Sequence, residues 1–155
     1  MSAGFCIPEA VRSRIDQALV ERHPILLACV SPDGQPILSF RGSVQCHGDD
    51  ALAVWIRNPD GLLLRSIHAN PRVALMYRDE DAKATYQFQG RARLDTTPSV
   101  RESLFQRMPQ AERNHDPKQK GAVMVVELDR IEGYAGLGPQ GRIDPVLLVR
   151  NPAQL

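Results

Sequence analysis

The stretch from Leu52 to Tyr77 decides the fold, and it reads LAVWIRNPDGLLLRSIHANPRVALMY. From residue 51 to 57, larger apolar side chains occupy every second position, which is the period-two pattern of a strand with two unlike faces. The same alternation returns from residue 73 to 77. The pattern predicts a strand at each end of the stretch, with Trp55 and Arg57 on the side of the first strand away from the core.

The residues between these strands favour a short helix. Asn58 is a good N-cap, and Pro59 suits the first helical position because its missing N–H would be unbonded there anyway. Pro71 disfavours helical dihedral angles at Asn70, so the helix should end there. Three apolar side chains fall on one side of the helical projection: Leu63, Leu64 and Ile67. We therefore predict strand, helix and strand in that order.

The segment before this stretch indicates one helix and two strands. Apolar residues recur every four positions from about Pro8 to Glu21, which predicts a helix. An apolar strand over Ile25–Ser31 ends in the turn sequence Ser-Pro-Asp-Gly. One strand is then expected over Pro36–Cys46. Its alternation places Leu38 and Phe40 on the core side and Arg41 and Ser43 on the other.

After the deciding stretch, the chain again reads mainly as strands. A long strand is expected over Ala84–Asp95, with Gly90 as a bulge or a point of close backbone approach. Thr97-Pro98 opens a helix that reaches about Met108. Three further segments follow: a short helix and loop over Pro109–Lys120, an apolar and central strand over Ala122–Leu128, and a last strand over Val146–Val149.

Six or seven strands joined by hairpin-length turns predict a closed or partly closed antiparallel β-barrel with peripheral helices. The 155 residues, 43% of them apolar, suit a single domain. We expect the N-terminal helix within residues 1–22, the barrel core within 25–133 and a C-terminal tail over 134–155.

Charge and composition exclude several functional classes. The net charge of +1 gives no basic field for nucleic acid, and no apolar run approaches the roughly 20 residues of a membrane span. Three cysteines, an odd number with no close pair, and no apolar leader at the N-terminus favour a soluble protein of the reducing cytoplasm. There is no Ser-His-Asp order, and the group from Cys46 to Asp50 lacks a second ligand set at metal-site spacing, so we expect neither a hydrolase nor a metal.

A strand, a short helix and an Asn-Pro-led strand within an antiparallel sheet resemble the flavin-binding split-barrel family, whose best-known branch is the pyridoxamine 5'-phosphate oxidase group. The resemblance spans roughly Ile25 to Gly133. It implies a split barrel that holds FMN between the subunits of a homodimer and acts as an oxidoreductase on an unidentified small molecule. Two alternatives remain open: a deazaflavin-dependent reductase on the same fold, and a non-enzymatic protein that binds haem or flavin.

The resemblance also implies where the cofactor binds, because relatives hold it with these strands and with the start of the short helix. The residues at those positions are Arg41, Ser43, Trp55, Ile56, Arg57, Leu64 and Arg65. Arginine suits the cofactor phosphate because its planar fork can bond two oxygens. This chain departs from its relatives at Leu63, where many carry lysine, and at Asp60, whose charge would compete with a phosphate at the helix start. Phosphate binding is therefore either rearranged onto Arg41, Arg57 and Arg65 or lost.

One loop offers a candidate catalytic group. His115 lies in the sequence Asn-His-Asp-Pro, and a histidine can act as an acid or base near neutral pH. The same residue types are ordinary in turns, so a structural role stays open. Arg113, Lys118 and Lys120 make the segment basic, which favours an anionic substrate if the loop reaches the cofactor. For the dimer interface, we expect the strands predicted over residues 84–95 and 122–128.

Overall fold

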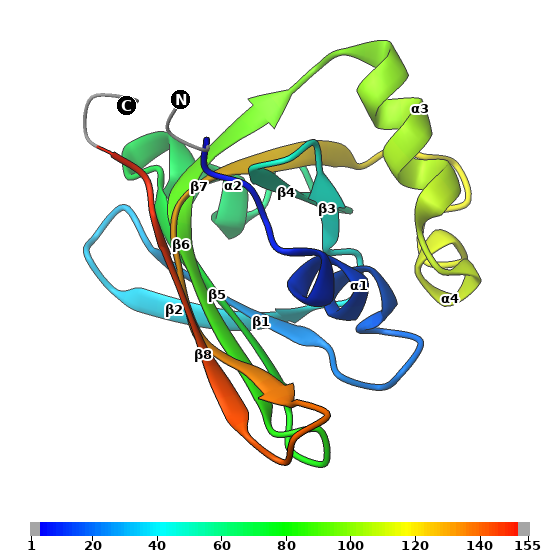
Figure 1. Cartoon of the computed structure of the whole chain (residues 1–155). Helices are drawn as coiled ribbons and strands as arrows, with labels where there is room; N and C mark the ends of the chain where they lie inside the picture. Colours follow the sequence, from blue (N-terminus) through cyan, green and yellow to red (C-terminus); the bar gives the residue numbers. More distant parts are fainter. Residues whose placement is uncertain (1–3, 152–155) are drawn as a thin grey trace.

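The computed structural model describes residues 4–151, which form eight antiparallel strands and four helices (Figure 1). The helices are α1 (Glu9–Gln17), α2 (Leu62–Ala69), α3 (Pro98–Arg107) and α4 (Gln110–Arg113). The strands are β1 (Ile25–Val30), β2 (Pro36–Arg41), β3 (Gln45–His47), β4 (Ala51–Ile56), β5 (Arg72–Asp79), β6 (Ala84–Asp95), β7 (Ala122–Leu137) and β8 (Ile143–Val149). No helix in this described part of the chain is long and apolar enough to cross a membrane.

The strands form a single sheet in the order β2-β1-β5-β6-β7-β4-β3, with β8 added alongside β7. β2 and β3 follow each other in the chain but stand at opposite ends of this order, so the sheet must curve until its ends approach. The mainly antiparallel split-barrel fold predicted from the sequence is therefore confirmed. Eight strands form instead of six or seven, because the single strand expected over Pro36–Cys46 is wrong and breaks at residues 42–44.

Ser43 explains why the chain turns at this break. Its hydroxyl accepts a hydrogen bond from the Trp55 N–H (3.0 Å) and donates one to the Trp55 carbonyl oxygen (3.1 Å). The side chain thus satisfies backbone groups of β4 that a continuing strand would otherwise bond. Residues 42–44 are free to form a corner, and β3 then pairs with β4, with Gln45 opposite Ala53.

Helix α2 begins three residues later than its sequence signals predict. The N-cap is Gly61, and Asn58 and Pro59 belong to a turn before the helix. In this turn, Asn58 Oδ1 accepts the Asp60 N–H (3.2 Å) and the Asn58 carbonyl oxygen accepts the Gly61 N–H (3.1 Å). The helix ends before Asn70 as predicted, and its three apolar side chains on the predicted face are buried.

Strand β4 is buried on both faces, whereas the sequence predicted one polar face. Its second face packs under α3, in a cluster made of Ala51, Ala53, Trp55, Leu104, Phe105, Met108, Val123 and Val125. Figure 1 shows α3 and α4 together beside β3 and β4. Trp55 is therefore a core residue, 3% exposed, because a helix distant in sequence covers it.

Of the two long strands, β6 has its predicted bounds and β7 extends beyond its predicted end. β6 has the predicted bounds, and the ladder register shifts between Gln89 and Gly90, which confirms the bulge. β7 is the central strand because it pairs with β4, β6 and β8. It continues to Leu137, beyond the core limit expected at residue 133, and β8 begins at Ile143. α1 is shorter than predicted, since residues 18–22 form turns.

One end of β5 contacts both α1 and the segment that follows it. Asp79 Oδ2 lies 3.5 Å from Arg14 Nη1 and 3.4 Å from His23 Nε2. Glu21 brings a second carboxylate to this group. Because the guanidinium of Arg14 already supplies a positive charge to Asp79, we interpret the cluster as an ion-pair network that fastens the helix segment to the barrel.

The orientation of β2 is the reverse of the predicted one. Leu38 and Phe40 are 67% and 69% exposed, whereas Arg41 turns inward and is half-buried. Phe40 shares its side of the sheet with Met76 of β5, because both stand opposite Leu26 of β1 in the ladders. We call this side, which carries Leu38, Phe40 and Met76, the outer face. Alternation separates two sides of an edge strand but does not show which side meets the core.

Candidate functional site

A cleft of about 610 Å³ opens where β2, the end of β4, the turn before α2 and the segment after α4 come together. Six of its lining residues carry the argument below: Ser39, Arg41, Ile56, Arg57, Leu63 and His115. The strand pairing explains why distant residues meet here. Ser43 is hydrogen-bonded to Trp55. Arg41 lies two residues before Ser43 and Arg57 two residues after Trp55, so the two arginines line the same cleft.

The two arginines give the cleft its electrostatic character. Arg41 donates from Nε to the Ser39 hydroxyl (3.0 Å), and the exposed Arg57 lies at the rim. Burial lowers the pKa of Arg41 from its ordinary value; Cys29 and Glu112 oppose this effect, and the positive charge of Arg57 adds to it. Within residues 4–151, neither guanidinium lies within ion-pair distance of a carboxylate. An anion bound between them would relieve their repulsion.

Of the seven predicted cofactor-binding residues, the structure brings three into the wall of this cleft: Arg41, Ile56 and Arg57. Ser43, Trp55 and Leu64 are buried and do not line it. Arg65 is exposed on α2 and is also absent from the lining. Leu63, at the position where many relatives carry lysine, does line the cleft and offers it an apolar side chain.

Sequence reasoning missed Cys29 and Ser39 as cleft residues. Both come from strands that pair directly, since Cys29 stands opposite Ile37 in the β1–β2 ladder. Burial raises the pKa of the Cys29 thiol, although a hydrogen bond with Ser66 and the charge of Arg41 act in the opposite direction. The alternation in β2 could have identified Ser39, because it shares a side of the strand with Arg41, but no local signal indicates that this side faces inward.

His115 lines the cleft, and the residue that follows it is bonded to β4. Asp116 is 8% exposed, and its Oδ2 accepts hydrogen bonds from Trp55 Nε1 (2.9 Å) and the Gly121 N–H (2.8 Å). The segment is thereby held against β4, and the exposed His115 lies at the mouth of the cleft. Lys118 and Lys120 are exposed and do not line it.

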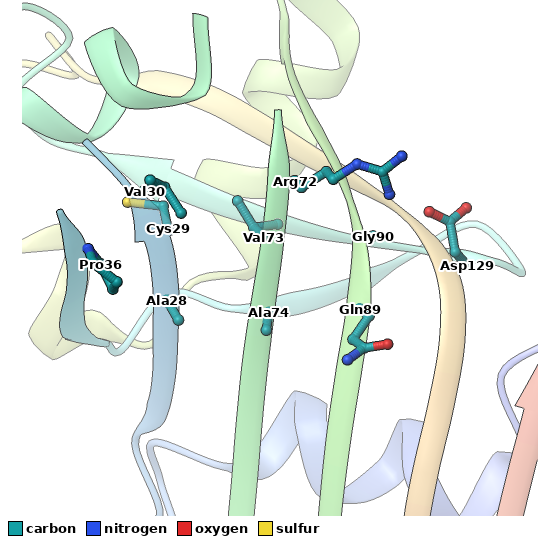
Figure 2. Close-up of a pocket in the computed structure, with 10 residues that line it drawn as sticks. All are labelled: Ala28, Cys29, Val30, Pro36, Arg72, Val73, Ala74, Gln89, Gly90 and Asp129. Carbon is teal, nitrogen blue, oxygen red and sulfur yellow. The ribbon is translucent and has the colours of Figure 1, made fainter. Parts of the chain in front are cut away.

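A second hollow of about 430 Å³ lies on the other side of β1, β5 and β6 (Figure 2). Ala28 and Ala74 stand opposite each other in the ladder, and their small side chains leave the outer face depressed at this point. Arg72 and Asp129 stand at its rim in Figure 2. Asp129 is already bound by Arg91, at 3.1 Å from Nη2, so this hollow offers less unpaired charge than the cleft does.

Solved structures share this fold at low sequence identity. HupZ of Group A Streptococcus is 19% identical, with 81% of this chain and 91% of that chain covered and a TM-score of 0.63. An F420 reductase is 24% identical, with 81% and 98% covered and a TM-score of 0.59. A haem-binding protein of Mycobacterium smegmatis is 17% identical, with 90% of this chain but 58% of that chain covered and a TM-score of 0.58. At these identities, the likeness shows the fold alone.

No curated protein matches the sequence. The family model of pyridoxamine 5'-phosphate oxidase matches residues 10–135, which is most of the chain and includes the cleft. The chain therefore belongs to the pyridoxamine 5'-phosphate oxidase family.

Proposed function

We propose that this protein binds FMN in the cleft and acts as an FMN-dependent oxidoreductase on a small molecule. One observation carries the proposal: Arg41 and Arg57 face the same cleft, and no carboxylate within the described residues pairs with either. A guanidinium fork can bind two oxygens of a phosphate monoester at once, so two such forks suit the phosphate of FMN. The cleft volume of about 610 Å³ also falls within the roughly 300–1,000 Å³ typical of cofactor sites.

The remaining walls suit the rest of the cofactor. Ile56 and Leu63 offer apolar side chains for a planar ring, and Leu63 leaves the phosphate to the two arginines. Asp60, whose charge would oppose a phosphate, is exposed and outside the lining. When bound, FMN supplies the redox chemistry by accepting a hydride, while the chain binds it, orients it and excludes water. A reducing compartment such as the cytoplasm fits the three free cysteines.

A titration of the purified protein tests the cofactor. We expect FMN to bind with quenching of its fluorescence and at one equivalent per chain. Parallel titrations with F420 and haemin decide among the alternatives, since the three compounds absorb differently. Haem is the alternative that a cleft histidine favours, because an exposed imidazole can ligate haem iron and His115 lies at the mouth. Binding of haemin or F420 without binding of FMN would overturn the FMN proposal.

We propose His115 as the group that acts on the substrate. His115→Ala should lower turnover by about 100-fold if the imidazole transfers a proton, because general acid–base catalysis typically contributes that much or more. The affinity for FMN should change less than about twofold, which separates a role in chemistry from a role in assembly. The measurement follows the flavin absorbance of the FMN-loaded protein with NADPH as a trial donor. Asn114→Ala is the matched control, and unchanged turnover in His115→Ala would remove the role.

We also propose that the protein is a homodimer that pairs through the outer face. Leu38 and Phe40 form an exposed apolar patch there, and Leu38 stands opposite Ala28 of the hollow in the β1–β2 ladder. The interface expected from the sequence lay on β6 and β7. The apolar side chains of these strands are mostly buried within one chain, so they are less available to a partner. Closed two-fold dimers are the commonest oligomers, and such a pair would cover the patch of each copy.

Phe40→Glu should convert the dimer to a monomer, because a charge placed in an apolar contact would lose its hydration without gaining a partner. Light scattering at micromolar concentration measures the mass. Val20→Glu is the control, since Val20 is 66% exposed and lies in the turn after α1, not on the outer face. A monomer mass for the unmodified protein would contradict the proposal, and so would an unchanged dimer mass in Phe40→Glu.

A further inference from the structure

The segment from Asn114 to Gly121 is held by hydrogen bonds to the carboxylate of Asp116. Asp116 Oδ1 accepts the Lys120 N–H (3.0 Å), while Asp116 Oδ2 accepts the Gly121 N–H (2.8 Å) and Trp55 Nε1–H (2.9 Å). One buried carboxylate thus closes the loop on itself and also ties it to the central part of the fold, because Trp55 lies in β4.

Arg101 of α3 binds the same segment. We call the group formed by Trp55, Arg101, Asp116 and Gly121 the anchor. The guanidinium of Arg101 donates to the carbonyl oxygens of Gln119 and Gly121, and it lies over the Trp55 ring at 4.6 Å from the ring centroid. Phe105, also on α3, contacts the Trp55 ring in an edge-type arrangement, with the two ring centroids 5.1 Å apart. These two contacts hold the ring of Trp55, whose N–H donates to Asp116. Gly121 belongs to this arrangement too, since a Cβ there would collide with the Trp55 ring and the Ile56 carbonyl oxygen.

The anchor ends one residue from the cleft. His115 precedes Asp116 and lines the cleft, together with Ile56, the residue that follows Trp55. The anchor is therefore connected to the cleft through neighbouring residues. Residues 55 and 116 are hydrogen-bonded to each other, and their chain neighbours, residues 56 and 115, line the cleft. Sequence proximity does not explain this coupling, because residues 55 and 116 are 61 positions apart.

The surroundings of the Asp116 carboxyl group favour its ionised form. Burial by itself would raise the pKa of Asp116, but hydrogen bonds from Lys120, Gly121 and Trp55 outweigh this effect and lower it from the ordinary value. A carboxyl group whose pKa is lower in the folded state stabilises the fold above its unfolded pKa, and this contribution is lost as the pH falls through the folded pKa. The carboxylate therefore accepts all three hydrogen bonds at neutral pH.

We propose that Asp116 is a positioning residue that, through its hydrogen bond with Trp55, fixes the segment 114–121 against β4 and thereby holds His115 at the mouth of the cleft, where it would contact a bound substrate. This inference rests on the proposed use of the cleft for FMN. The anchor itself involves no cofactor, so its geometry can be tested without one.

The first test uses proton NMR of the imidazole Hε1 resonances of the four histidines. Trp55→Phe keeps a ring against Phe105 and Arg101 but removes the donor to Asp116. We expect the His115 resonance to shift or broaden in Trp55→Phe and in Asp116→Asn, while those of His23, His47 and His68 stay in place. Asp144→Asn is the control, because Asp144 is exposed on β8. An unmoved His115 resonance in both variants would overturn the proposal.

The second test adds FMN to the same samples. In the unmodified protein, the flavin ring should displace the His115 resonance, and Trp55→Phe should reduce that displacement at least about twofold at saturating FMN. A purely structural loop would leave the FMN-induced displacement intact in the variant, which would also overturn the proposal. If no FMN binds, the cofactor proposal fails, and the first test still decides whether Asp116 positions His115. Should Asp116→Asn fail to fold, Trp55→Phe alone gives both measurements.

Discussion

Replacing Arg41 and Arg57 together with alanine is expected to weaken FMN binding at least about 100-fold. A hydrogen bond to a charged group is worth about 1.5–3 kcal/mol, and each 1.4 kcal/mol is a factor of about ten in affinity. Both guanidinium groups face the cleft, and no carboxylate among the described residues lies within ion-pair distance of either, so the double variant breaks no ion pair. Calorimetry with FMN measures the change directly.

Arg142→Ala provides the control for this experiment, because Arg142 is exposed in the turn between β7 and β8 and does not line the cleft. Arg65→Ala makes a sharper comparison. The sequence offered Arg65 for the phosphate, but it is outside the lining, so its replacement should weaken binding less than that of Arg57. The reverse order would place the phosphate on α2. Unchanged affinity in the double variant would exclude the cleft as the FMN site.

Gly90→Ala is expected to lower the free energy of unfolding by about 3 kcal/mol. A Cβ at Gly90 would collide with the Glu127 carbonyl oxygen, which is backbone of the central strand β7 and cannot move without breaking the ladder. Overpacking of this kind typically costs about 1–3 kcal/mol, and the rigidity of the neighbouring backbone favours the upper end of that range.

Urea denaturation followed by the fluorescence of Trp55 measures this loss, since Trp55 is the only tryptophan of the chain. Gly138→Ala is the matched control: the nearest atoms to a Cβ there are 3.4 Å and 3.5 Å away, which is ordinary contact or close to it. A loss below about 0.5 kcal/mol in Gly90→Ala would mean that the bulge can relax, and the close approach would then not be what selects glycine.

Local signals predicted the elements whose ends are marked by backbone chemistry. Thr97-Pro98 placed the start of α3, and Pro71 placed the end of α2, because proline restricts both its own φ and the residue before it. Alternation predicted the bounds of β6. The start of α2 was wrong because Asn58 and Pro59 suit a turn as well as they suit a cap, and only the position of Gly61 distinguishes the two in the fold.

The cleft was predicted less completely than the strands that form it. The sequence predicted both Arg41 and Arg57 as cofactor residues, and the cross-strand contact between Ser43 and Trp55 brings the two together in the structure. The prediction that Trp55 lies on the side of the strand away from the core was wrong. Its burial depends on α3, which begins more than 40 residues later. Cys29 and Ser39 were missed because their access to the cleft depends on which side of β2 faces inward.

The sequence by itself determined the strand–helix–strand unit, the bulge at Gly90 and the resemblance to the family. These features arise from residues within a few positions of one another, where proline, glycine and alternation restrict the backbone directly. The tertiary structure alone decided that β2 turns Phe40 outward, that α3 buries Trp55 and that Asp116 brings His115 to the cleft. Each of these outcomes depends on contacts between segments far apart in the chain. Their free energies are set by packing and hydrogen bonding across the closed sheet and not by local propensity.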